Sequence, residues 1–263
     1  MVWNRLVGPL AALSLGLAAM PASAGVSWTF TGSNCVSGCG SSYDGNALTF
    51  DGAGGAGNVT ASAWSNTGSG GDLQTGTLNL YSGGLGVTNQ GESGTPPNHS
   101  TDNSGYIDSI LFDFGGDAVD LSDVSVGWWY NDSDISVLAY TGSGDPTADL
   151  GAGNTYNDLL GSGWSLVGNY DNVGQNGGTA TVNPDDVSSS YWLIGALNTD
   201  LTSTSCSSYS YSYSTSNCSD YVKIYALAGD TGNGGGTPPS QVPVPGTLAL
   251  FGLGLLLTGL RRR

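Results

Sequence analysis

The chain has 263 residues, with 5 Lys and Arg against 21 Asp and Glu and a formal net charge of −16 at pH 7. A surface this acidic repels nucleic acids and anionic lipid headgroups, so we exclude nucleic-acid binding. Gly contributes 44 residues, and no helical stripe of apolar residues runs through the sequence. Short β-branched and aromatic runs separated by turn-forming residues predict an all-β protein.

The first 24 residues are typical of a secretory signal peptide. Arg5 gives a weakly positive start, and the apolar stretch Leu6–Met20 follows it. Small residues then end at Ala24, an A-x-A-type site that predicts cleavage by signal peptidase before Gly25. The protein is therefore expected to be exported.

Residues 25–228 are expected to form a single extracellular domain, a jelly-roll-like β-sandwich of about eleven short strands. In Tyr106–Phe114, the alternation places Ile110, Phe112 and Phe114 on the inner face. One helical turn is expected within Thr147–Leu160. The predicted strands are Val26–Phe30, Ala47–Phe50, Val59–Trp64, Leu73–Tyr81, Tyr106–Phe114, Val124–Tyr130, Ile135–Tyr140, Trp164–Tyr170, Thr179–Val182, Tyr191–Ala196 and Tyr221–Ala228.

Four cysteines in an exported domain predict disulfides. Three pairings are possible, and we favour the local one, Cys35 with Cys39 and Cys206 with Cys218. A zinc site is disfavoured, because the spacings lack partner histidines and an oxidising compartment opposes free thiolates.

Between the signal peptide and the C-terminal tail, Gly25–Ser240, the chain has a single Lys or Arg, Lys223, against all 21 acidic residues, a balance of 1 − 21 = −20. Asp in loops rich in Gly, Ser and Asn is the ligand that Ca²⁺ uses, since this cation needs several oxygens on a turn-forming backbone. The alternative is an acidic surface that serves only solubility.

Two polar segments are candidates for a Ca²⁺ site. The first runs from Glu92 through His99 to Asp108, and the second, Asn131–Asp134, precedes a strand. We predict that His99 orients one carboxylate from outside the ligand set. Alternatively, these residues form Asx-turns and His99 bonds a backbone carbonyl, and no EF-hand spacing is present. The predicted ligands are Asp102, Asn103, Asp108, Asp132 and Asp134.

A row of tyrosines lies between the last two cysteines. Tyr209, Tyr211 and Tyr213 alternate with Ser, so in a strand they would share one face. Tyr rings flanked by hydroxyls suit stacking on sugars. An equal alternative is that the row packs on the sheet as a small core.

The predicted domain has few candidate catalytic residues. There is no G-x-S-x-G elbow beside the single His of the predicted domain, and no feature singles out a pair of Asp for glycoside hydrolysis. Lys223 is the domain's one cation for stabilising a developing anion. We therefore expect that the protein is not an enzyme.

The C-terminus has three parts after a Gly- and Pro-rich linker over 229–241. Residues 242–245 read Val-Pro-Val-Pro, the apolar run Gly246–Leu260 follows, and Arg261, Arg262 and Arg263 end the chain. The run of 15 residues is about 22 Å as a helix, short for a stable span. The arginines would stay cytoplasmic, which places the Pro-rich segment at the outer membrane face. An ordinary C-terminal anchor is the alternative.

This tail, 242–263, resembles the PEP-CTERM signal read by exosortases of Gram-negative bacteria. The departure is that Pro243-Val244-Pro245 replaces the usual Pro-Glu-Pro; Gly246 follows and belongs to the predicted signal. The resemblance implies transient insertion in the inner membrane, cleavage by exosortase, and a final place at the cell surface or in the extracellular matrix.

A second resemblance covers Leu85–Gly142. This segment contains the pattern "N-H-x-x-D-N-x-G-x-x-D-S-I-L" from Asn98, then a Gly-Trp, then "D-S-D-I-S-V-L-A-Y-T-G". Together they resemble a family of exosortase-dependent surface proteins. This resemblance implies a structural or adhesive role, with extracellular polysaccharide as a partner and no assigned activity. Two alternatives are a secreted hydrolase acting on that polysaccharide and a binding protein that stays anchored.

Overall fold

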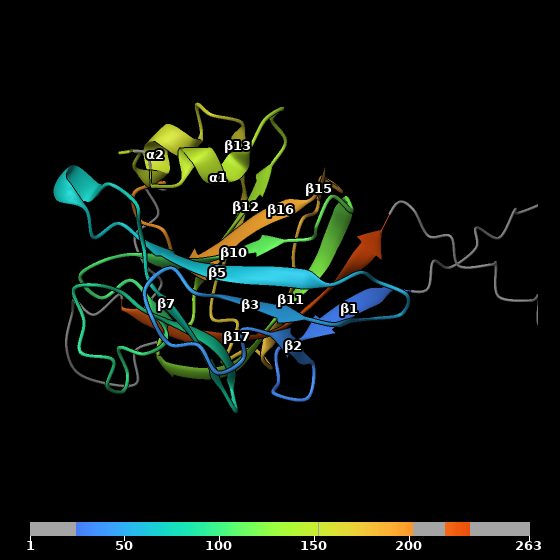
Figure 1. Ribbon diagram of the computed structural model, residues 1–263, viewed down its shortest axis with the longest axis horizontal. Helices are drawn as coiled ribbons and strands as arrows, with labels where there is room; N and C mark the ends of the chain where they lie inside the picture. Colours follow the sequence, from blue (N-terminus) through green and yellow to red (C-terminus); the bar gives the residue numbers. More distant parts are fainter. Residues whose placement is uncertain (1–24, 152, 202–218, 232–263) are drawn as a thin grey trace, which may run out of the picture. The chain divides into compact units, whose positions relative to one another are not determined.

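The computed structural model describes residues 25–151, 153–201 and 219–231. This part of the chain is mostly β and forms two curled antiparallel sheets (Figure 1). The signal peptide, the linker beyond Thr231, the tail and the segment with Cys206, Tyr209, Tyr211, Tyr213 and Cys218 lie outside the described residues. In the described part, no helix has the length and apolar character needed to cross a membrane.

The first sheet has nine strands in the described residues, built around the long strands β11 and β17. Its main path is β14-β11-β17-β1-β4, while β15 pairs with β11, β8 and β9 pair with β17, and β7 pairs with β8. The strands are β1 (Val26–Thr29), β4 (Gly52–Ala53), β7 (Thr77–Tyr81), β8 (Gly84–Thr88), β9 (Thr101–Asp102), β11 (Val119–Asn131), β14 (Thr179–Thr181), β15 (Ser188–Ser189) and β17 (Asp220–Thr231).

The second sheet has eight strands in the described residues, in the order β13-β12-β16-β10-β5-β3-β2, with β6 on β5. Most neighbouring strands in both sheets are far apart in the sequence. The strands are β2 (Cys35–Ser37), β3 (Ala47–Phe50), β5 (Val59–Ser65), β6 (Gln74–Thr75), β10 (Asp108–Asp113), β12 (Ile135–Tyr140), β13 (Trp164–Tyr170) and β16 (Tyr191–Ala196).

The main core lies between the sheets and takes side chains from both. Phe30 stacks on Phe112 with ring centroids 5.2 Å apart and meets Phe50 edge to face at 5.0 Å. Ile110, Phe112 and Phe114 are buried in this core, which confirms the predicted alternation. Two curled sheets around a shared core are consistent with the predicted β-sandwich. The jelly-roll-like strand order stays a prediction.

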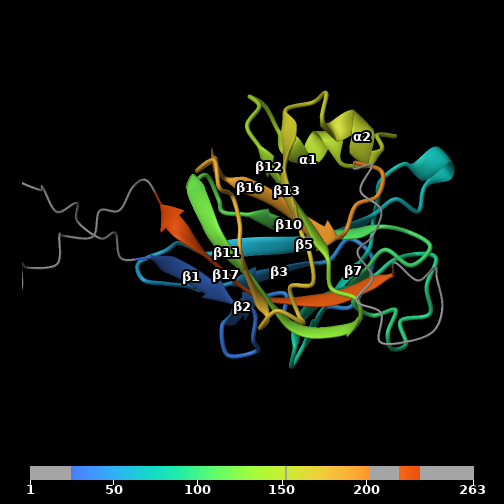
Figure 2. The same ribbon diagram turned by 180° about the vertical axis from the view of Figure 1, so that it is seen from behind.

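A smaller core covers the outer face of the second sheet. Two short helices, α1 (Pro146–Asp149) and α2 (Tyr156–Leu159), lie beside β12, β13 and β16 (Figures 1 and 2). Tyr156 and Leu159 pack there with Leu111 and Leu193. Leu111 is therefore buried as well, so β10 has apolar contacts on both faces. A 3₁₀ turn, η1 (Ser69–Gly71), is the third helical element in the described residues.

Most predicted strands are present, although their ends differ. Ala47–Phe50, Ile135–Tyr140, Trp164–Tyr170 and Tyr191–Ala196 match to the residue. The expected Leu73–Tyr81 is interrupted at Gly76 and forms β6 and β7. The strand β17 continues to Thr231, three residues beyond the predicted domain end at 228.

The structure contains the Cys35–Cys39 disulfide, which confirms the first half of the predicted local pairing. We expect Cys206 to pair with Cys218. Replacing both by Ser should then lower the free energy of unfolding by about 2–4 kcal/mol, because the unfolded chain is no longer closed into a loop and gains conformational entropy. Peptide mapping without reduction checks the pairing, and a peptide that joins Cys35 to Cys206 would contradict it.

Candidate metal centres

The described residues contain two groups of three carboxylates in which one oxygen from each carboxylate lies within 4.8 Å of the others. We call Glu92, Asp102 and Asp108 the Glu92 cluster, and Asp132, Asp134 and Asp220 the Asp220 cluster. All these residues except Glu92 are buried. Each cluster therefore concentrates negative charge in a region with little solvent.

Both clusters lie at one edge of the fold, where strands of the two sheets begin or end. In the first sheet, Asp102 is opposite Tyr221, next to Asp220. In the second sheet, β10 and β12 both begin beside the end of β16, because Ser109 is opposite Gly195 and Ile135 opposite Ala196. A backbone bond from Leu197 N to Asp134 O, 3.0 Å, continues this edge.

In the Glu92 cluster, hydrogen bonds satisfy only one oxygen of each carboxylate. Asp108 Oδ1 accepts from Asn89 Nδ2 at 3.0 Å, and Asp102 Oδ1 accepts from Ser104 N at 2.9 Å in an Asx-turn. Asp102 Oδ2, Asp108 Oδ2 and Glu92 Oε1 are buried and have no hydrogen-bond partner in the described structure. Each carboxylate of this cluster therefore has one buried, unpaired oxygen.

Burial is the main cause of raised pKa values in this cluster, and repulsion between the carboxylates adds to it. The pKa of Asp102 rises to about 8, through burial first and the charge of Glu92 second. Burial raises the pKa of Glu92 to about 7. The pKa of Asp108 lies well above its ordinary value for the same reasons. Without a cation, the cluster retains protons at neutral pH.

The Asp220 cluster is held more tightly by backbone donors. Asp220 Oδ1 accepts from Asp134 N at 2.8 Å, and Asp134 Oδ1 accepts from Asn172 N at 2.7 Å. Asp132 Oδ1 accepts from Ser133 N at 2.9 Å and from Gln175 Nε2 at 3.1 Å. Asp134 Oδ2 is buried without a hydrogen-bond partner in the described part of the chain.

Burial is also the main cause of the pKa shifts here. It raises the pKa of Asp220 to about 8 and that of Asp134 to about 6, and the neighbouring aspartates raise both further. Hydrogen bonds from Asp134 N and the Asn103 side chain lower the pKa of Asp220. Burial therefore outweighs the three donors that lower the pKa values of Asp220 and Asp134.

The predicted ligands divide between the two clusters. Asp102 and Asp108 lie in one, and Asp132 and Asp134 lie in the other. Asn103 lies between them: its Nδ2 donates to Asp220 Oδ2 at 2.7 Å, and its Oδ1 accepts from Asp220 N at 2.8 Å. Sequence reasoning did not include Glu92 or Asp220 among the ligands.

His99 lies in a different setting from the one predicted. Its Nε2 is 3.5 Å from Lys223 Nζ, and its ring meets Tyr81 edge to face at 4.6 Å. The Lys223 ammonium is 4.3 Å from the Tyr81 ring centroid and 4.1 Å from that of Trp128. Burial lowers the pKa of Lys223 to about 8. The domain's one lysine thus contacts aromatic rings, and His99 belongs to neither carboxylate cluster.

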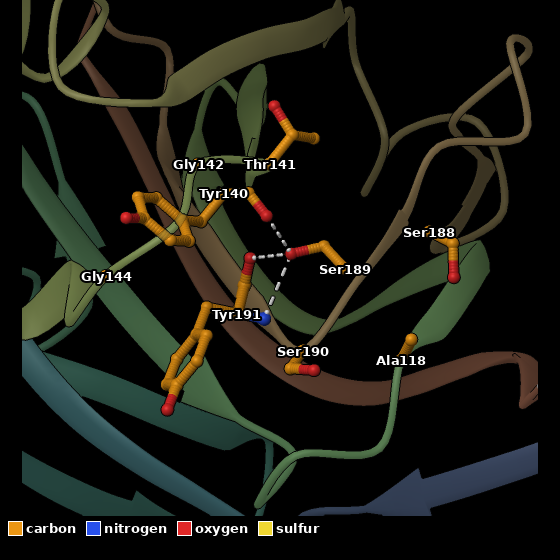
Figure 3. Close-up of a pocket in the computed structure, with 9 residues that line it drawn as sticks. All are labelled: Ala118, Tyr140, Thr141, Gly142, Gly144, Ser188, Ser189, Ser190 and Tyr191. Atoms are coloured by element: carbon orange, nitrogen blue, oxygen red, sulfur yellow. Dashed lines mark hydrogen bonds between the residues drawn. The ribbon is translucent and has the colours of Figure 1, made fainter.

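A pocket of about 280 Å³ lies elsewhere, between β12, β15 and β16 (Figure 3). Tyr140 and Tyr191 supply its two rings, which meet edge to face at 6.4 Å. The buried Ser189 hydroxyl donates to the backbone oxygen of Tyr140 at 2.6 Å, which holds the backbone of Tyr140 against Ser189. Further lining comes from Ala118, Thr141, Gly142, Gly144, Ser188 and Ser190.

Comparison with known proteins identifies one segment. Residues 241–263 match the family model of the PEP-CTERM protein-sorting motif. The tail of this chain is a PEP-CTERM sorting motif. No curated protein and no solved structure matches the chain.

The PEP-CTERM motif indicates an exosortase-sorted extracellular protein of a Gram-negative bacterium, located at the cell surface or outside the cell. It also implies processing by exosortase. The absence of Glu between Pro243 and Pro245 therefore does not prevent the match. This finding confirms the resemblance of the tail that the sequence showed.

We expect the PEP-CTERM tail to be removed during sorting, because its apolar run of 15 residues is short for a lasting anchor. Mass spectrometry of the protein from the surface or the medium should then find no peptide from Leu248–Leu260. Cells that lack exosortase are the control, and there the tail should remain. Full-length protein ending at Arg263 in the membranes of normal cells would contradict this expectation and favour a permanent anchor.

Proposed function

We propose that this protein is a structural or adhesive component of the cell surface or the extracellular polysaccharide matrix, with a β-domain that binds Ca²⁺ at the Glu92 cluster. The observation that carries the calcium proposal is the set of unpaired, buried oxygens of Glu92, Asp102 and Asp108. A buried carboxylate without donors is costly unless it is protonated or bound to a cation.

The donor set favours Ca²⁺ over other metals. The cluster consists of carboxylates, without His or Cys, and such oxygen ligands suit hard cations. Ca²⁺ takes six to eight oxygens and accepts irregular arrangements, whereas Mg²⁺ demands near-octahedral geometry and retains several waters. Each carboxylate supplies one unpaired oxygen, and water or backbone oxygens would complete the large coordination shell of Ca²⁺, so we propose Ca²⁺ as the cation.

Burial argues against the alternative of a secreted hydrolase. A glycosidase needs two carboxyl groups that face a cleft wide enough for a sugar. Asp102 and Asp108 are 0% exposed, so a substrate cannot reach them, while a cation requires much less space. We therefore propose a binding role and no enzymatic activity for these carboxylates.

Calcium titration by calorimetry tests the proposal. The full-length chain in detergent, treated with EDTA and then freed of it, should bind Ca²⁺. The variant Asp102→Asn with Asp108→Asn should lose binding at this cluster and keep its shape, because Asn is nearly isosteric with Asp. Failure of the wild-type protein to bind any Ca²⁺ up to 10 mM, about ten times the weakest affinity of extracellular modules, would refute the calcium proposal.

For the adhesive part, the Tyr140–Tyr191 pocket is a candidate sugar contact within the described residues (Figure 3). Tyr rings stack on the apolar faces of sugars, and the Ser and Thr hydroxyls can bond sugar hydroxyls. Asp113 and Asp145 act electrostatically on Tyr191 and raise its pKa, after burial, so an anionic ligand is disfavoured. We therefore propose a neutral glycan as the ligand.

On a glycan array, Tyr140→Ala or Tyr191→Ala should weaken binding of the selected glycan by about fivefold to tenfold, because one stacking contact is lost. Tyr43→Ala is a matched control, since Tyr43 is 63% exposed and lies outside the pocket. Equal binding by all three variants would exclude this pocket. It would leave the predicted row Tyr209, Tyr211 and Tyr213 as the remaining candidate.

A further inference from the structure

We infer that the domain takes a second divalent cation in the Asp220 cluster, and that Asn103 couples this site to the one in the Glu92 cluster. This inference rests on the proposed calcium binding and extends it to a pair of ions. Each site would join one sheet to the other at the same edge of the fold.

The second cluster has its own evidence for a ligand. Asp132, Asp134 and Asp220 are 2%, 1% and 1% exposed, and one oxygen from each carboxylate lies within 4.8 Å of the others. Asp134 Oδ2 is buried and unpaired in the described structure. One oxygen of Asp132, one of Asp134 and both of Asp220 accept hydrogen bonds, among them one from the Gln175 amide to Asp132. Ser133 also bonds Gln175 and so holds that amide in place.

Among the residues that the structure describes, no Lys or Arg side chain contacts either cluster. Lys223 is the one Lys or Arg between Gly25 and Ser240. Its ammonium lies over the rings of Tyr81 and Trp128, and the structure records no ion pair for it among the described residues. Six carboxylates in two clusters therefore depend on protons or external cations for neutralisation.

Asn103 provides a direct connection between the clusters. It follows Asp102 of the Glu92 cluster, and three hydrogen bonds join it to Asp220: the two side-chain bonds of 2.7 and 2.8 Å and a backbone bond from Asn103 N to Asp220 O of 3.3 Å. Its Nδ2 also donates to Leu197 O at 3.0 Å. A cation that fixes Asp102 therefore fixes Asn103, which positions the Asp220 carboxylate.

The pair of sites spans the two sheets. Asp102 belongs to β9 of the first sheet and Asp108 begins β10 of the second. Asp220 begins β17 of the first sheet, and Asp134 leads directly into β12 of the second. Each ion would thus hold the sheets together where the strands end. An ion in one site would restrict the motion of the strand ends that also hold the other site. The second ion would then lose less conformational entropy on binding, which predicts positive cooperativity.

Calorimetric titration of the EDTA-stripped, full-length chain with CaCl₂ tests the inference through the stoichiometry. We expect two ions per chain. One ion per chain would overturn the inference and leave the proposed function intact, whereas no ion would refute both. This measurement on the wild-type chain does not depend on the folding of any variant.

Variants then test the coupling. Asp134→Asn with Asp220→Asn should leave one ion, bound about fivefold to 100-fold more weakly than the second ion of the wild type, because the coupling between the sites is lost. Asn103→Ala keeps all six carboxylates, so it should still bind two ions but without cooperativity. The control Asn79→Ala removes an amide whose partners, Ser42, Thr77 and Thr88, belong to neither cluster, and it should behave as wild type. Unchanged cooperativity in Asn103→Ala would overturn the coupling.

Discussion

Calcium at millimolar concentration is expected to raise the melting temperature of the EDTA-treated protein by about 5–10 °C. An ion at 100 times its dissociation constant stabilises the native state by about 2.7 kcal/mol, since the unfolded chain does not assemble the site. For a domain of about 200 residues, each kcal/mol corresponds to about 2–4 °C. Scanning calorimetry in EDTA and in 5 mM CaCl₂ measures this difference.

The expected shift depends on Asp102 and Asp108. Replacing both with Asn should reduce it markedly, and the calcium-free variant should melt above the calcium-free wild type, because the repulsion between buried carboxylates is gone. A matched control is Asp51→Asn with Asp117→Asn, which removes the same charge from two exposed positions. Identical melting curves in EDTA and calcium would show that these aspartates are turn formers.

The strand pattern could be read from the sequence where apolar and polar residues alternate. Ile135–Tyr140 and Tyr191–Ala196 are rich in β-branched and aromatic residues, and their bounds were predicted to the residue. The strands that were missed have no such pattern. Gly84–Thr88 contains two glycines, and β9 consists of Thr101 and Asp102 alone. These strands form because other strands offer them backbone groups, β7 and β17 to β8 and β17 to β9, which is a tertiary effect.

The site could be predicted in part for a similar reason. Asp102 and Asp108, like Asp132 and Asp134, are close in sequence, so local spacing brings each pair together. Asp220 is 86 residues from Asp134 and joins it only because β17 pairs with the end of β11. Local pattern contains no information on such pairing. The separation of the carboxylates into two groups likewise follows from the register and not from the spacing.

The protein without calcium is expected to be more stable at pH 5 than at pH 8, the reverse of the usual behaviour of acidic groups in ion pairs. The pKa of Asp102 and that of Asp220 are each raised from 3.8 to about 8, mainly by burial. In the unfolded chain these groups lose their protons near pH 4. Between pH 4 and pH 8 the native state therefore binds more protons, and its stability falls as the pH rises.

Other titrating groups do not reverse the expected decrease of stability with rising pH. Glu92, with a pKa of about 7, and Asp134, with a pKa of about 6, act in the same sense. Lys223, whose pKa falls to about 8, is charged in both states over most of this range. Burial and Lys223 lower the pKa of His99, so this group opposes the trend, but it is a single residue against four or more carboxylates.

Melting temperatures measured in EDTA from pH 5 to pH 8 test this expectation, and a decrease of about 5 °C or more is predicted. With saturating calcium the direction should reverse, because bound Ca²⁺ requires ionised carboxylates and protons compete with it. Binding near pH 7 should accordingly release protons, which calorimetry in buffers of different ionisation enthalpy detects. If the melting temperature instead rises with pH in EDTA, the carboxylates are ionised in the native state, and the clusters are compensated by donors other than protons or cations.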